Sequence, residues 1–114
     1  MAARNNDLNK RAQETAEAIR RESAALRETA ASTRRTAEVF RMSAKALRRE
    51  ADASPNPRQA AMRREHADLK DEHATALDDH AFIMDAEADS AEVKARAAEA
   101  RAARARAPEG AKPD

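Results

Sequence analysis

Small and larger side chains alternate along residues 16–51 with a period of seven, which is the pattern of a coiled-coil helix. The small positions are Ala16, Ser23, Ala30, Ala37, Ala44 and Ala51. Three residues after the first five of them come the larger ones, Ile19, Leu26, Thr33, Phe40 and Leu47. A stripe of this kind lets a partner helix approach closely on its small side. We therefore expect a helix over residues 7–53, with Asn5, Asn6 and Asp7 as candidate N-caps and a flexible N-terminus over residues 1–6.

A sharp break follows at residues 54–57, where the sequence reads Ser-Pro-Asn-Pro. Two prolines remove two amide donors and disfavour the α conformation at the residue before each of them. An extended Asn56 suits an N-cap, and Pro57 suits the first position of a new helix. These residues predict a turn that ends one helix and starts another.

The second predicted helix covers residues 57–103 and also repeats by sevens. Three successive acid-His-Ala triplets place His66, His73 and His80 at equal spacing. At about 100° per residue, these histidines share one helix face with four large apolar residues. Those four residues are Met62, Leu69, Ile83 and Met84. The last stretch, residues 104–114, contains two prolines and the single glycine, and we expect it to be a disordered tail.

The two predicted helices differ in charge, which favours packing one against the other. Residues 1–54 carry a net charge of +4, and residues 65–93 carry −9. A short turn between two helices of similar length favours an antiparallel hairpin. In the register that this suggests, Phe40 lies near His73. The same register sets Arg48, Arg41 and Arg34 beside Glu65, Glu72 and Asp79, respectively.

The fold class expected is therefore all-α: an antiparallel two-helix coiled-coil hairpin with a Pro-Asn-Pro turn. The predicted intrachain seam consists of Ile19, Leu26, Phe40, Leu47, Met62, Leu69, Ile83 and Met84. Of the 47 hydrophobic residues 32 are alanine, so few large side chains are available to stabilise two long helices. We expect two hairpins to associate into a helical bundle. Val39, Phe82 and Val93 are candidate oligomer contacts, because they point away from the predicted seam.

The histidines are the residues with the most suggestive chemistry. Positions seven apart on a helix are separated by about 10.5 Å, whereas a zinc ion needs each ligand nitrogen within about 2.1 Å. A metal site within one helix is excluded, so we assign no metal ligand. His66, His73 and His80 are instead interpreted as polar residues that fix the register of the seam. They are also candidates for pH sensitivity: if they are covered, the helix pair should loosen between about pH 6.5 and 5, because burial disfavours imidazolium.

Composition argues against several classes of protein. The chain has no cysteine, tyrosine or tryptophan and no glycine-rich phosphate loop, so we expect no enzymatic activity, no cofactor and no small-molecule substrate. No apolar run approaches the roughly 18 residues of a membrane span, and no signal-peptide pattern is present. We expect a cytoplasmic protein that does not engage a membrane. The 17 arginines against 5 lysines favour a bacterial source.

The function expected is that of a coiled-coil protein-interaction module, an adaptor, scaffold or regulatory partner acting through homo- or hetero-oligomerisation. The alternative is an accessory protein that binds nucleic acid without sequence specificity, through the arginine stripe and a basic C-terminal run. The candidate phosphate contacts of that run are Arg96, Arg101, Arg104 and Arg106. Against this alternative, the chain offers no aromatic side chains suited to base stacking, and interleaved glutamates interrupt the stripe. A helical switch controlled by the histidines is a third hypothesis.

Overall fold

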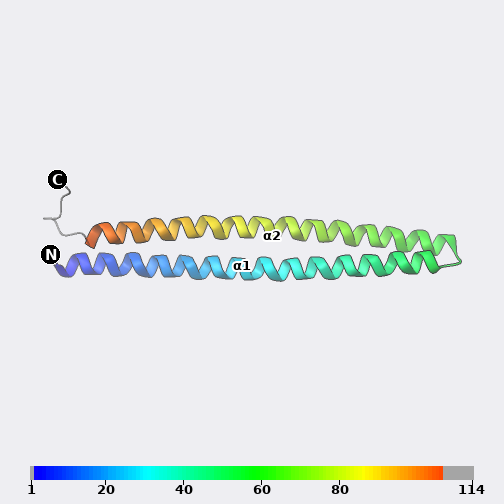
Figure 1. Ribbon diagram of the computed structural model, residues 1–114, viewed down its shortest axis with the longest axis horizontal. Coiled ribbons are helices and arrows are strands. Elements are labelled where there is room, and N and C mark those ends of the chain that lie inside the picture. Colours follow the sequence, from blue (N-terminus) through cyan, green and yellow to red (C-terminus); the bar gives the residue numbers. More distant parts are fainter. Residues whose placement is uncertain (1, 107–114) are drawn as a thin grey trace. The chain divides into compact units, whose positions relative to one another are not determined.

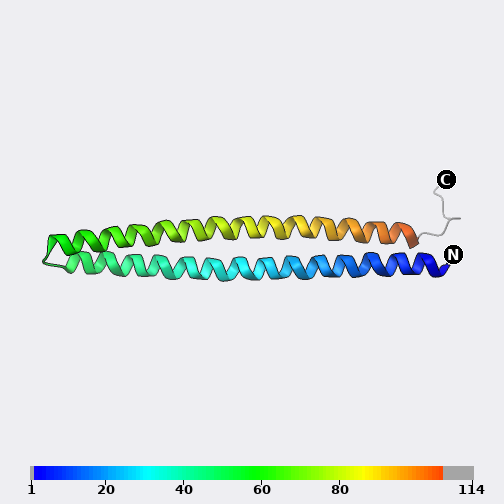
Figure 2. The ribbon, with the colours of Figure 1, turned by 180° about the vertical axis from the view of Figure 1, so that it is seen from behind.

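The computed structural model describes residues 2–106, which form two helices, α1 (Ala2–Ala53) and α2 (Pro57–Arg106). The helices pack against each other, so the predicted all-α helical hairpin is confirmed. The chain divides into two compact units: unit 1 combines residues 1–27 with 86–114, and unit 2 covers residues 28–85. Within each unit, the two helical stretches run side by side in opposite directions (Figure 1), as the view from behind also shows (Figure 2).

The helix ends differ from the predicted ones at both termini. α1 begins at Ala2 and not near Asp7, so Asn5, Asn6 and Asp7 lie inside the helix and do not cap it. Nothing in residues 2–6 forbids helix, and alanine and arginine favour it. α2 continues to Arg106, three residues beyond the predicted end. The predicted tail therefore starts as helix, and its residues 107–114 lie outside the described part of the chain.

Residues 54–56 connect α1 to α2, and side-chain oxygens satisfy backbone donors there. The Asn56 Oδ1 accepts hydrogen bonds from the backbone amides of Arg58 at 3.0 Å and Gln59 at 3.3 Å. The backbone carbonyl of Asn56 accepts the first intrahelical bond, from the amide of Ala60 at 3.0 Å. Asn56 thus occupies an N-cap position, and Pro57 follows it where a missing amide hydrogen costs nothing.

Alanine forms the contact between the two helices. On α1 the buried positions repeat every seven residues: Ala16, Ser23, Ala30, Ala37, Ala44 and Ala51. On α2 they do the same: Ala60, Ala67, Ala74, Ala81, Ala88, Ala95 and Ala102. Among the described residues, the only larger apolar side chain that is buried is Met84, at 7% relative accessibility. We call this arrangement the alanine seam, and its small side chains allow the two backbones to approach closely.

The predicted seam of α2 is wrong in its rotation. Met62, Leu69 and Ile83 are exposed, and Met84 alone of the four is buried. Each histidine precedes a buried alanine by one residue, so α2 is turned by roughly 100° about its axis from the predicted orientation. The alanine stripe and the predicted stripe of α2 both repeat every seven residues. Only the alanine stripe allows close packing of the two helices, because small side chains then face small side chains. The larger residues are left on the surface.

Candidate interaction surface

Ion pairs join the two helices along one side of unit 2. Arg34 pairs with Asp85 and Arg41 with Asp78, while Arg48 Nη2 lies 2.9 Å from Asp68 Oδ1 and 2.6 Å from Asp71 Oδ2. We call this the charged side; it consists of Arg34, Arg41, Arg48, Asp68, Asp71, Asp78 and Asp85. In unit 1 the same arginine spacing continues, with Arg20 paired to Glu99 and Arg27 to Asp89 and Glu92.

These partners correct the predicted ones, which were Glu65, Glu72 and Asp79. In an antiparallel pair, the residue four positions after a seam alanine on one helix meets the residue four positions after a seam alanine on the other. Arg41 follows Ala37 by four, and Asp78 follows Ala74 by four. Glu72 lies five positions after its seam alanine and points away from α1.

Hydrogen bonds to the carboxylates further stabilise the charged form of Arg41 and Arg48. The hydrogen bond to Asp78 raises the pKa of the Arg41 guanidinium. The hydrogen bonds to Asp68 and then Asp71 likewise raise the pKa of Arg48. Both groups therefore remain cationic across the neutral range, and the charged side is largely satisfied within the chain.

The opposite side of unit 2 is almost free of charge, and we call it the neutral side. α1 contributes Thr36, Val39, Phe40, Ser43 and Leu47. α2 contributes Met62, His66, Leu69, His73, Ala76, Leu77, His80, Ile83 and Met84. Helix geometry at about 100° per residue places these positions together, opposite the Arg–Asp pairs. Charge on this side of unit 2 is confined to Lys70 and to the Arg63–Glu50 pair, whose Nε and Oε2 atoms are 3.8 Å apart.

Direct contacts fix which residues of the two helices meet on the neutral side. The rings of Phe40 and His73 stack, with centroids 4.6 Å apart and planes inclined by 17°. The predicted proximity of these two residues is therefore confirmed. The Nζ of Lys70 lies 5.3 Å from the centre of the same Phe40 ring, a cation–π distance. This contact was not predicted, because Lys70 faces α1 only in the observed rotation of α2.

Large apolar residues on the neutral side remain accessible to solvent. Val39, Met62, Leu69 and Ile83 have relative accessibilities of 64%, 63%, 57% and 53%. Phe40, Leu47 and Leu77 are half-buried. Several large apolar side chains exposed on one side of two packed helices are a candidate interaction site. Leu77 was not predicted to belong to this surface, because its position on α2 became clear only with the observed rotation of that helix.

The three histidines lie exposed along the middle of the neutral side. The predicted loosening of the intrachain seam at low pH was conditional on these histidines being covered. That condition is not met, since the alanines that follow them take the seam positions.

The other candidate contact residues lie apart from the neutral side, except Val39. Phe82 is 72% accessible, and its helix face is that of Asp78 and Asp85, on the charged side. Val93 is also exposed but belongs to unit 1. Val39, Phe82 and Val93 were therefore predicted as one set of oligomer contacts, but they lie on different surfaces of the structure. The rotation of α2 about its axis decides which of them share a surface.

Unit 1 contains one buried polar residue in the alanine seam. The Ser23 hydroxyl donates to the backbone carbonyl of Ala88 at 3.1 Å and accepts from Arg27 Nη1 at 2.6 Å. The buried hydroxyl thereby has both a hydrogen-bond acceptor and a hydrogen-bond donor as partners within the seam. The sequence placed Ser23 in the seam stripe but did not predict its partner.

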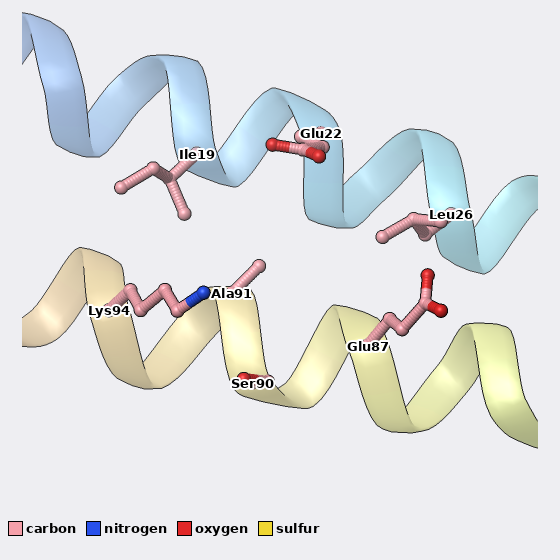
Figure 3. A pocket seen from close by; sticks show the side chains of 7 residues that line it. All are labelled: Ile19, Glu22, Leu26, Glu87, Ser90, Ala91 and Lys94. Atoms are coloured by element: carbon pink, nitrogen blue, oxygen red, sulfur yellow. The ribbon is translucent and has the colours of Figure 1, made fainter.

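A shallow hollow of about 260 Å³ lies on the surface of unit 1. It is lined by Ile19, Glu22 and Leu26 of α1 and by Glu87, Ser90, Ala91 and Lys94 of α2. Ile19 and Leu26, both half-buried, point toward α2, and the Glu87 side chain extends toward α1 below Leu26 (Figure 3). Nothing in this lining places a base beside a nucleophile.

Three arginines of the basic C-terminal run, Arg96, Arg101 and Arg104, are exposed on α2. At about 100° per residue Arg101 and Arg104 are neighbours on one face of the helix, and all three arginines fall within an arc of about 140°. The side chain of Arg106 lies outside the described part of the structure.

Comparisons with known proteins give no match to a family model, a curated protein or a solved structure. Over residues 2–106, neither helix has the length and apolar character needed to cross a membrane. In the same part of the chain, no three His, Asp or Glu side chains gather in a way that could hold a metal ion. Inference about function therefore depends on the surfaces of the two units.

Proposed function

We propose that this chain is a non-enzymatic helical protein-interaction module, an adaptor, scaffold or regulatory partner that binds protein through the neutral side of unit 2. The observation that carries the proposal is the gathering of Val39, Met62, Leu69 and Ile83, each more than half exposed, on one nearly uncharged surface. At about 25 cal/mol per Å² of apolar surface removed from water, covering these side chains favours association. Catalysis on a water-soluble substrate would not require an exposed apolar surface of this kind.

The state of the arginines favours protein over nucleic acid as the partner. Five members of the periodic stripe, Arg20, Arg27, Arg34, Arg41 and Arg48, are engaged by carboxylates of α2. Phosphate binding by these side chains would have to break those pairs. Arg96, Arg101 and Arg104 are accessible and lie within an arc of about 140° on α2, so the alternative function, non-specific binding of nucleic acid, depends on these three residues.

The experiment compares the native mass of the tagged chain in a cell extract and after purification. The native mass of the wild-type chain should exceed the 12.5 kDa of one chain in at least one of the two conditions. Leu69→Lys, which places a charge in the neutral side, should lower that mass. Phe82→Lys is the matched control, because it adds the same charge to an exposed apolar residue on the charged side. A one-chain mass for the wild type in both conditions would contradict the proposal.

A further inference from the structure

We infer that the partner of the neutral side is a second copy of this chain, which docks neutral side on neutral side so that α1 of each copy lies against α2 of the other. This inference rests on the proposed function and names its partner. The result is a four-helix arrangement within the two copies of unit 2. Its two-fold symmetry uses the same surface on both chains.

The size of the neutral side suits such a contact. From Met62 to Ile83 it extends for about 21 residues, or roughly 30 Å at 1.5 Å per residue. Two adjacent helices are about 20 Å wide, so the projected area is roughly 600 Å². A stable interface buries about 800 Å² of accessible surface on each partner, and accessible area exceeds projected area on a surface with protruding side chains. The contact is therefore large enough for a specific dimer.

Docking through the neutral side would also bury the large apolar side chains that the alanine seam leaves exposed. Within one chain, the seam buries a single large apolar residue of unit 2, Met84. Docking would remove Val39, Met62, Leu69 and Ile83 from water. Because charge within the surface is limited to Lys70 and the Arg63–Glu50 pair, like-charge repulsion between two docked copies is confined to the two Lys70 side chains. The threonine, serine and histidine side chains there can form hydrogen bonds across the contact.

Charges at the outer edges of the neutral side indicate which helices face each other. The edge on α1 carries Arg35, Arg49 and Glu28 and is net basic, whereas the edge on α2 carries Glu65, Glu72, Asp79 and Arg58 and is net acidic. All seven are exposed, and none forms an ion pair among the described residues.

These edge charges favour one arrangement of the two copies. When α1 of one copy lies along α2 of the other, the basic edge meets the acidic edge, and two-fold symmetry repeats this match on the other side. Packing α1 on α1 and α2 on α2 would instead juxtapose like charges, which opposes association. The edge charges thus favour the crossed arrangement and give a reason why the same chain is the partner.

Sedimentation equilibrium of the purified full chain tests this inference, with helicity followed by circular dichroism. The wild type should reach the mass of two chains at micromolar concentration. Leu69→Lys should raise the dissociation constant by about tenfold or more, since it leaves a charge in a desolvated contact. Phe82→Lys should leave the constant within about twofold. A purified wild type that stays a single chain, or a Leu69→Lys variant that dimerises as tightly as the wild type, would overturn the inference.

Charge reversal then distinguishes the two arrangements. Replacing Glu65, Glu72 and Asp79 together by lysine should weaken the dimer, because both edges are then basic. Adding Arg35→Glu and Arg49→Glu to this variant should restore the dimer, since opposite edges meet again. A dimer that the added changes fail to restore would contradict the crossed arrangement. If the wild type associates in a cell extract but stays single when pure, the proposed function stands and the second copy is excluded as its partner.

Discussion

A leucine placed in the alanine seam should destabilise the hairpin strongly. Ala74 is fully buried on α2, in a contact whose closeness depends on the absence of larger side chains. Ala74→Leu adds three carbon atoms at this position, so either the helices separate locally or the new side chain adopts a strained rotamer. Inserting methylene groups into a well-packed interior typically costs about 1–3 kcal/mol.

Each kcal/mol lowers Tm by about 4–8 °C in a domain of roughly this size. The expected loss is therefore about 4–24 °C in a melt followed by circular dichroism. Helix propensity contributes little, because alanine and leucine are both strong helix formers. The control is Ala86→Leu, which makes the same exchange at an exposed position of α2. Melts should use equal chain concentrations, because association shifts apparent stability.

The comparison also separates the observed rotation of α2 from the predicted one. If the histidine face formed the seam, Ala74 would lie toward its edge, and a leucine there would add apolar contact. An Ala74→Leu variant that melts at or above the Ala86→Leu control would therefore refute the alanine seam.

Two further changes should have smaller effects. Ser23→Ala removes the cross-helix hydrogen bond of unit 1 and should lower the free energy of unfolding by about 0.5–1.5 kcal/mol in urea titrations, whereas an unchanged value would show that this hydrogen bond adds nothing to stability. Asn56→Ala removes the cap of α2 and should cost about 0.5–2 kcal/mol in the same titrations; Asn56→Gly should recover most of it, and a loss as large as that of Asn56→Ala would contradict the capping role.

Much of the fold follows from local chemistry, which the sequence displays directly. The two prolines and Asn56 predicted where one helix ends and the next begins, and the opposite charges of the two helices predicted a hairpin. The contact of Phe40 with His73 followed from folding the chain about that break. These features depend on a few residues close in sequence or on the sign of charge, and neither requires the exact rotation of a helix.

The rotation of α2 was not predictable from the hydrophobic pattern. Its alanine stripe and its stripe with Met62, Leu69 and Ile83 have the same period, and the second contains the larger apolar side chains. Burial of apolar area favours the second stripe, whereas close backbone approach and the reach of Arg41 to Asp78 favour the first. The conflict is resolved if the larger residues serve a different contact. The same rotation separates Val39 from Phe82, so the candidate site could not be assembled before the structure was known.

Reaction of single thiols with a maleimide tests most directly whether the neutral side is covered by a partner copy. The chain has no cysteine, so Thr75→Cys and Ala76→Cys each introduce one thiol. Both positions are exposed within one chain, and these adjacent residues lie on the charged and neutral sides, respectively. As protein concentration rises through the dimer transition, labelling of the Ala76→Cys variant should slow markedly, while that of Thr75→Cys should stay constant. Equal labelling rates for the two variants at every concentration would contradict the account.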